Sequence, residues 1–329
     1  MYCPRLDHFV RLEPSGKFGR CGHMVKPKHF DSLEEMERSD WLYGIKKKMS
    51  SNEWPSECSR CEMSESHKKE SIRTNSLKRH RVLEPLSNDY LIVGGVLDNV
   101  CNSACQTCNP HLSTKIGSLQ NGKHYKRIDN YVKFWELPSH RIVELDVNGG
   151  EPTASKNYKK ILSNLPKKIK IVRMNTNGSK IINEIEELLK RDIKVIVTLS
   201  LDGVGKIHDY VRWPIKWSSY ERTVDSYLGL QQKYKLLSLD SWTTVSCLNV
   251  NDMPNILDFS KQKNIPHDWA FLTHPVPLNV GFKNRFTEMG KSFSPNKIAV
   301  GEDNSKILDA FILRQDTLRN IKIQDYLNF

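Results

Sequence analysis

The sequence predicts an α/β protein built on a parallel sheet, and three features of residues 89–275 support this prediction. Six apolar strand-like runs alternate with five amphipathic helix-like runs, which is the pattern of repeated β-then-α units. Most of the apolar runs are nearly continuous, as expected for strands covered on both faces. Glycine and polar residues follow most of these runs, at the carboxyl ends of the predicted strands, where parallel folds place their catalytic and binding residues. This periodicity is compatible with an open sheet and with a barrel.

The individual elements can be assigned from the same periodicity. The predicted core strands span residues 90–97, 142–147, 169–174, 193–201, 242–248 and 268–272. The helices predicted between them carry apolar residues at helical spacing and span 128–137, 157–165, 180–191, 220–234 and 253–263. A last amphipathic helix is expected over 304–320. We therefore expect an amino-terminal module (1–88), a core (89–275) and a carboxyl-terminal extension (276–329).

Length and composition predict an ordinary soluble enzyme-sized protein. The chain has 329 residues, which is enough for one large domain and one small one. No stretch is long and apolar enough to span a bilayer, and the first residues lack the apolar core of a signal peptide. We therefore expect a cytoplasmic protein without a membrane partner. Thiols stay reduced in that compartment, so the eight cysteines favour metal ligation over disulfides.

The formal net charge of +12 raises the possibility of a nucleic-acid partner. The basic residues are scattered over several segments, and no recognisable nucleic-acid-binding motif accompanies them. A charged, solvated surface is the preferred interpretation.

The amino-terminal segment predicts a small hairpin followed by a helix. Strands are expected at 9–12 and 17–20, joined by a tight turn through Pro14 and Gly16. Ser32 and Glu35 fit a capping box, so a helix is expected to begin there and continue through the apolar positions up to Met49.

Four cysteines of this segment form the first candidate metal site. They comprise two around the hairpin and a C-x2-C pair near its end: Cys3, Cys21, Cys58 and Cys61. Two thiolates on one tight turn can face the same metal, and four thiolates close a coordination sphere. A structural zinc ion and an iron-sulfur cluster both fit this ligand set.

A second candidate site lies directly after the first core strand. Cys101, Cys105 and Cys108 supply three thiols at C-x3-C-x2-C spacing, one fewer than a structural zinc site requires. Three thiolates can hold three irons of a [4Fe-4S] cluster and leave the fourth iron open. An open coordination position is typical of a metal centre that performs chemistry.

The C-x3-C-x2-C spacing resembles the signature of the radical SAM enzymes. After the next predicted strand comes Asn148-Gly149-Gly150-Glu151-Pro152, which is similar to the GGEP motif of that family. The resemblance implies a six-stranded partial (β/α)6 barrel and S-adenosylmethionine (SAM) bound to the open iron. The sequence departs from the family pattern at Thr107, because many members have an aromatic residue before the last motif cysteine.

Further cofactor-binding residues follow from the same resemblance. Gly149 and Gly150 allow close backbone approach, and Glu151 is expected to bind the amino group of SAM. The planar guanidinium of Arg212 is expected near its carboxylate. The remaining candidates follow later strands and are expected around the ribose, the adenosyl group and the edges of the site: Thr176, Asn177, Ser200, Asp202 and Asn249. No catalytic residue is assigned.

The amino-terminal segment resembles the twitch (half-SPASM) module of radical SAM enzymes. The similarity rests on the cysteine hairpin, the helix after Ser32, and the stretch from Trp54-Pro55 through Cys61 to Glu65. In relatives such modules bind an auxiliary iron-sulfur cluster. Gly22 stands where relatives often have a second cysteine, so the resemblance implies four ligands and a fully ligated second [4Fe-4S] cluster.

The resemblance implies an enzyme that cleaves SAM reductively and uses the resulting radical to take hydrogen from a substrate. Relatives with such modules commonly modify peptides or proteins, and an external one-electron reductant of the flavodoxin or ferredoxin type is implied. The alternatives are the same chemistry on a small molecule, such as a sugar or nucleotide, and a zinc-stapled nucleic-acid-binding protein.

Overall fold

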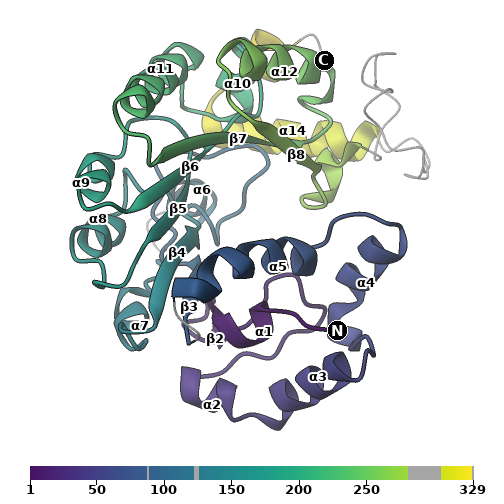
Figure 1. Cartoon of the computed structure of the whole chain (residues 1–329). Helices are drawn as coiled ribbons and strands as arrows, with labels where there is room; N and C mark the ends of the chain where they lie inside the picture. Colours follow the sequence, from purple (N-terminus) through teal and green to yellow (C-terminus); the bar gives the residue numbers. More distant parts are fainter. Residues whose placement is uncertain (87–88, 122–125, 281–304, 328–329) are drawn as a thin grey trace. The chain divides into compact units, whose positions relative to one another are not determined.

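The predicted α/β fold class is confirmed by a computed structural model of the chain, which describes residues 1–86, 89–121, 126–280 and 305–327 (Figure 1). The strands form an eight-stranded, mostly parallel sheet in the order β2-β1-β3-β4-β5-β6-β7-β8. The last six are neighbours in chain order with helices between them, as the partial-barrel expectation requires. They are β3 (Leu91–Val96), β4 (Ile142–Asn148), β5 (Ile171–Thr176), β6 (Lys194–Ser200), β7 (Leu237–Val245) and β8 (His267–Phe271).

Strand β7 differs most from its prediction. It begins five residues before the predicted 242, because its side chains alternate between buried and less buried positions and the run is not continuously apolar. It ends before the predicted 248, where the Asn249 side chain accepts a hydrogen bond from Ser246 N at 2.7 Å and closes a turn. Residues 246–248 therefore lie outside the strand, contrary to the prediction. Cys247 follows the strand and is half-buried.

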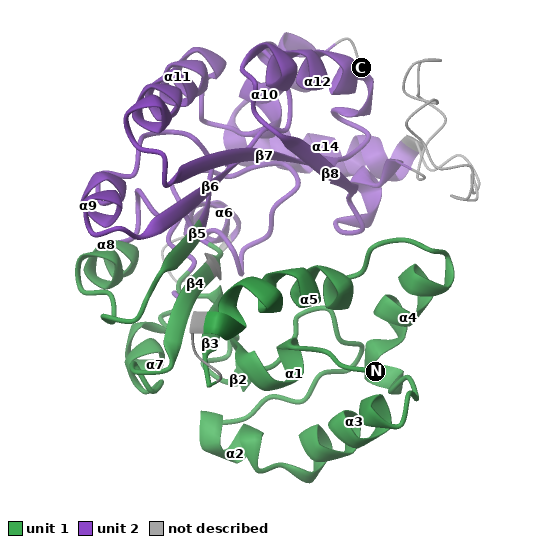
Figure 2. Cartoon of the chain, viewed as in Figure 1, with its two compact units in different colours: residues 1–98, 128–149, 156–173 green, residues 99–127, 150–155, 174–329 purple. Residues whose placement is uncertain are grey.

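The residues divide into two compact units, neither of which is a continuous segment (Figure 2). Unit 1 contains residues 1–98, 128–149 and 156–173, and unit 2 contains 99–127, 150–155 and 174–329. The three-part division at residues 88 and 275 remains a prediction, and residues 281–304 of its last part lie outside the described residues.

In unit 1 the amino-terminal hairpin belongs to the main sheet. Strand β1 (Phe9–Leu12) pairs antiparallel with β2 (Phe18–Gly19) and parallel with β3, with Phe9 opposite Ile92. Close backbone approach requires a glycine at position 95, where φ is +91° and a Cβ would lie 2.2 Å from Leu12 O. The cysteine-bearing hairpin therefore extends the sheet edge.

The helix expected after Ser32 is divided into two. Ser32 caps α2 (Leu33–Glu37) and Ser39 caps α3 (Asp40–Ser50). Ser32 Oγ accepts from Glu35 N at 3.0 Å, but the Glu35 carboxylate accepts from Asp31 N at 2.9 Å, so the reciprocal bond of a capping box is shifted by one residue. The other helices of unit 1 are α1 (Arg5–His8), α4 (Ser59–Ser66), α5 (Ile72–Leu83), α7 (Tyr131–Trp135) and α8 (Lys156–Ser163).

In unit 2 the helices alternate with the strands as predicted. Helix α9 (Ile185–Lys190) packs against β6, and α11 (Trp217–Lys233) packs against β7 (Figure 1). Helix α12 (Met253–Gln262) leads into β8, and α14 (Ser305–Arg319) confirms the expected terminal helix. Two short helices were not predicted, namely α6 (Thr114–Asn121) and α10 (Lys206–Val211).

An apolar cluster joins α10 to α14 within unit 2. Tyr210 and Val211 of α10 pack with Leu308 and Ile312 of α14, and all four are buried. The terminal helix is thereby fixed beside the segment that carries Arg212. Among the helices that the structure describes, none is long and apolar enough to cross a membrane.

Candidate functional site

The three-cysteine loop lies in unit 2, between the end of β3 and α6, and backbone hydrogen bonds fix it to α10. Ala104 N donates to Trp213 O and Gln106 N donates to Val211 O, both at 2.8 Å. Cys101 N donates to Thr114 Oγ1 at 3.3 Å, at the start of α6. The two short helices that were not predicted therefore hold the loop on both sides.

Two of the three thiols of this loop lie beside one hydroxyl group, and Cys108 Sγ lies 3.7 Å from Asn109 O. Ser103 Oγ lies 3.2 Å from Cys101 Sγ and 3.7 Å from Cys105 Sγ. Burial raises the pKa of Cys101, and it raises the pKa of Cys108 to about 12 although the Arg212 guanidinium acts in the opposite direction. Cys101 and Cys108 are thus protonated at neutral pH, and metal binding must release their protons. Over the described residues, no three cysteine, histidine or carboxylate side chains are already arranged as a metal site.

Glu151 is a completely buried carboxylate with four hydrogen-bond donors. Oε1 accepts from Thr176 Oγ1 at 2.8 Å and from Thr153 Oγ1 and N at 2.9 and 3.2 Å. Oε2 accepts from Asn177 N at 2.7 Å. Desolvation raises the pKa of Glu151, and these donors oppose that shift. Three of the four bonds go to one oxygen, so Oε2 keeps accepting capacity.

Asn177 links Glu151 to the cysteine loop. Its Nδ2 donates to Asn102 Oδ1 at 2.7 Å and to Ser103 Oγ at 3.1 Å. The structure therefore brings together Glu151, Thr176 and Asn177, three of the residues expected at the SAM site, and joins them to the loop that carries the thiols.

A second group forms around Asp202. Its carboxylate accepts from Arg212 Nη1 at 3.0 Å and from Thr244 N at 2.8 Å, and Asn249 Nδ2 donates to the Asp202 carbonyl at 3.0 Å. Arg212 Nε is buried without a hydrogen-bond partner in the described part of the chain. Nearby Cys105 and Asp202 outweigh the effect of burial, so the pKa of Arg212 lies above its ordinary value.

The other predicted cofactor residues occupy strand ends. Gly149 and Gly150 follow β4 with φ of +87° and +63°, a conformation that favours glycine. A Cβ on Gly149 would lie 2.9 Å from Val96 Cγ1. Ser200 is the last residue of β6 and half-buried, and no hydrogen bond joins its side chain to the other site residues within the described ranges.

The four amino-terminal cysteines line one small cavity in unit 1, which Arg5, His23 and Arg73 also line. Burial raises the pKa of Cys3 to about 11 and that of Cys58 to about 12, and the neighbouring cysteines add to both shifts. The four cysteines share this cavity, although no three of the described side chains are already arranged as a metal site there. The donor set therefore fits a fully thiolate-ligated centre.

The sequence did not predict three residues of the site around the three-cysteine loop. Thr153 binds the Glu151 carboxylate, Ser103 lies among the thiols, and Arg319 of α14 donates to the carbonyl of Ala104 in the loop. Thr153 and Ser103 could have been found by their position, because each lies two residues from a predicted site residue. No local signal marks Arg319, since α14 is distant in the sequence.

Comparisons with known proteins place these features in a family context. No protein-family model matches the chain. AlbA of Bacillus subtilis (strain 168), an antilisterial bacteriocin subtilosin biosynthesis protein, is 29% identical over 143 residues. This match spans 42% of the chain and only 31% of AlbA.

Solved structures give more distant matches. Streptococcus suis SuiB bound to S-adenosylmethionine matches with a TM-score of 0.44 and 13% identity, covering 96% of this chain and 71% of SuiB. SuiB bound to the precursor peptide SuiA matches with a TM-score of 0.43 and 13% identity, covering 96% and 70%.

The site combines the motifs that carry the family resemblance. The three thiols occupy one loop after the first core strand, and the Gly-Gly-Glu turn after the next strand connects to that loop through Asn177. These features match what the resemblance to radical SAM enzymes of the SPASM/twitch type implies, and part of the chain is similar to AlbA.

Proposed function

We propose that the chain cleaves SAM at a [4Fe-4S] cluster held by Cys101, Cys105 and Cys108, and modifies a peptide or protein. The observation that carries this proposal is the set of three thiols on one loop. Hydrogen bonds connect this loop to the buried Glu151 through Asn177, and to the residues on both sides of Arg212. The cluster, when bound, would supply the electron that splits SAM into methionine and a deoxyadenosyl radical, which takes hydrogen from the substrate.

The residues around the loop would bind and orient SAM. Glu151 Oε2 has accepting capacity for an ammonium group, and Thr153, Thr176 and Asn177 fix the carboxylate. Asp202 occupies only Nη1 of Arg212, so the partnerless Nε and the remaining donors suit a carboxylate. Asn249 holds the Asp202 backbone, and Gly149 and Gly150 leave room at the strand end. Ser200 would contact the ribose.

The peptide substrate and the second cluster are supported by the family resemblance. AlbA acts in the biosynthesis of a bacteriocin, and twitch-type relatives commonly modify peptides. The cavity lined by Cys3, Cys21, Cys58 and Cys61 would hold an auxiliary [4Fe-4S] cluster that accepts an electron from the substrate radical or positions the substrate. An external one-electron reductant of the flavodoxin or ferredoxin type would reduce the catalytic cluster.

The proposal is tested with anaerobically reconstituted protein, SAM and dithionite. The wild type is expected to form 5′-deoxyadenosine. A variant with alanine at Cys101, Cys105 and Cys108 should form none, because the open iron is lost. Cys247→Ala is the matched control, since Cys247 belongs to neither ligand set, and it should retain the activity.

Iron-loaded wild type that forms no deoxyadenosine would contradict the proposal. Colourless protein that binds nucleic acid with strong salt dependence would instead favour the zinc-stapled alternative.

A further inference from the structure

We infer that Arg319, in the last turn of α14, is a positioning residue for the cluster at Cys101, Cys105 and Cys108, and that its charge raises the reduction potential of that cluster. The inference rests on the proposed function, because it concerns the same site. It assigns a role to a helix on which sequence analysis found no chemistry.

The Arg319 side chain donates hydrogen bonds to the backbone of the cysteine loop. Its side chain is buried, with the residue only 5% exposed. Nε donates to Ala104 O at 2.8 Å and Nη2 to Cys105 O at 3.4 Å. Nη1 donates to Gln315 O at 3.0 Å and Gln315 Oε1 at 2.5 Å, which orients the guanidinium from its own helix. The planar fork thus connects α14 to two consecutive residues of the loop.

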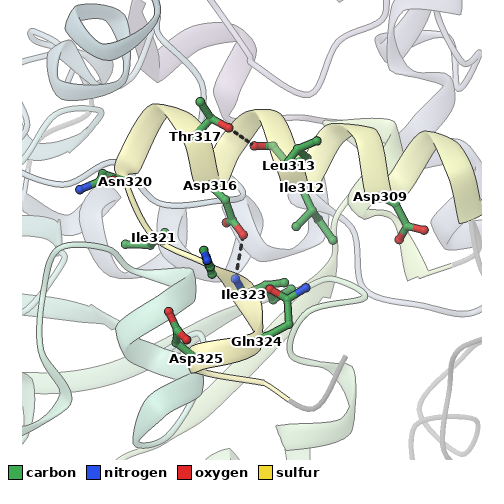
Figure 3. Close-up of a pocket in the computed structure, with 11 residues that line it drawn as sticks. Asp309, Ile312, Leu313, Asp316, Thr317, Asn320, Ile321, Ile323, Gln324 and Asp325 are labelled. Atoms are coloured by element: carbon green, nitrogen blue, oxygen red, sulfur yellow. Dashed lines mark hydrogen bonds between the residues drawn. The ribbon is translucent and has the colours of Figure 1, made fainter.

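The packing of α14 fixes this position. Tyr210 Oη donates to Asp316 Oδ1 at 2.8 Å, which ties α14 to α10. Figure 3 shows the Asp316 side chain pointing to the turn after the helix, where Ile323 N donates to Oδ2 at 2.7 Å. Both carboxylate oxygens of Asp316 are therefore engaged, and Asp316 forms no ion pair with Arg319 in the described part of the chain.

The other deeply placed arginines in this protein have carboxylate partners. Arg20 pairs with Glu37 at 3.2 Å, Arg79 contacts Glu144 and Asp146, and Arg212 pairs with Asp202 at 3.0 Å. Arg319 donates only to neutral oxygens, as far as the described residues show. A buried cation without a paired anion is costly. Among acidic groups, its strongest electrostatic coupling is to Cys105, followed by Tyr210, the Asp316 carboxylate and Cys108.

When the cluster is bound, it would place negative charge next to the Arg319 guanidinium, which has no ion-pair partner among the described residues. Iron binding converts the neighbouring thiols to thiolates, and reduction adds one more negative charge at the cluster. A fixed buried cation stabilises the reduced state more than the oxidised state, because the more negative state interacts more strongly with it. Arg319 therefore favours electron uptake from the external one-electron donor.

The test is a redox titration of reconstituted protein, followed by electron paramagnetic resonance. The catalytic cluster is recognised by the change of its signal on addition of SAM. Arg319→Gln is expected to shift the midpoint potential to a more negative value. Arg319→Lys keeps the charge and should stay near the wild-type potential. Arg314→Gln is the matched control, because it removes the same charge from an exposed position of α14.

Each outcome decides the inference. Equal potentials in Arg319→Gln and wild type, at equal iron content, would overturn it. Equal negative shifts in the lysine and glutamine variants would also overturn it, because hydrogen-bond geometry rather than charge would then be responsible. If Arg319→Gln binds no iron, Arg319→Lys alone decides, since a shifted potential there contradicts the charge effect and an unshifted one supports it. Wild type without a SAM-sensitive cluster signal would refute the proposed function instead.

Discussion

His208 illustrates how strongly burial acts on single residues near the candidate site. It lies on α10, one turn before Arg212, and is completely buried between the rings of Trp217 and Tyr220. Desolvation, with a smaller contribution from Arg212, lowers its pKa from 6.5 to about 3. The imidazole therefore stays neutral in the folded protein and serves as an aromatic packing residue.

This depressed pKa predicts an acid sensitivity of the fold. The unfolded chain takes up a proton at His208 below pH 6.5, whereas the folded protein does not until about pH 3. Stability is therefore fully present above pH 6.5 and falls by about 1.4 kcal/mol per pH unit below it, or roughly 2 kcal/mol at pH 5. His208→Phe should remove this contribution when urea unfolding is compared between pH 7 and pH 5.

The exposed His67 provides the control for this comparison. His67→Phe should keep the wild-type pH dependence. If the free energy of unfolding changes equally with pH in wild type and in His208→Phe, the pKa of His208 is not the cause of the acid sensitivity.

At the scale of elements, the pairing of β1 with β3 depends on one glycine. Gly95 combines a positive φ with backbone contact to Leu12 across the strands, so any side chain would meet backbone atoms that cannot rotate away. Gly44 differs, because it lies inside α3 and a Cβ at this position would have nothing within 4 Å. Glycine is therefore sterically required at position 95, whereas position 44 has room for a side chain.

Alanine substitutions at these two positions should act in opposite directions. Gly95→Ala is expected to destabilise the protein by about 2 kcal/mol or more, since it combines backbone strain with a close contact. Gly44→Ala should stabilise it by about 0.5–1 kcal/mol, because alanine favours a helix interior. Urea unfolding midpoints measure both changes. A neutral Gly95→Ala would mean that β1 separates from β3 at little cost.

At the scale of the whole molecule, seven of the eight cysteines belong to two candidate ligand sets, and each set lies within one compact unit. The four-thiol set belongs to unit 1 and the three-thiol set to unit 2. We therefore expect the two centres to be loaded independently.

Iron and sulfide analysis tests this independence. The alanine variant of Cys101, Cys105 and Cys108 should lose one cluster and keep about four iron and four sulfide per chain at the amino-terminal site. Retention of zinc without iron in this variant would contradict the auxiliary cluster and support a structural zinc site.

The sequence was most informative where signals are local. The alternation of strands and helices and the terminal helix follow from periodicity, and the grouping of Glu151, Thr176 and Asn177 near the cysteine loop was implied by the resemblance to radical SAM motifs. The sheet contact of β1 and the contact of Arg319 with Ala104 were not predictable, because each joins residues far apart in the chain. Helix α10 was also missed, since its six residues are too few to show a clear period.

The pairing of Phe9 with Ile92 has a consequence for the order in which the protein is assembled. All four cysteines of the amino-terminal set precede residue 62, whereas β1 finds its parallel partner only when β3 has left the ribosome. All four cysteines are thus synthesised before β1 can pair with β3. Docking of the hairpin onto the sheet must therefore wait for the first residues of the core, whereas the four cysteines are available before that.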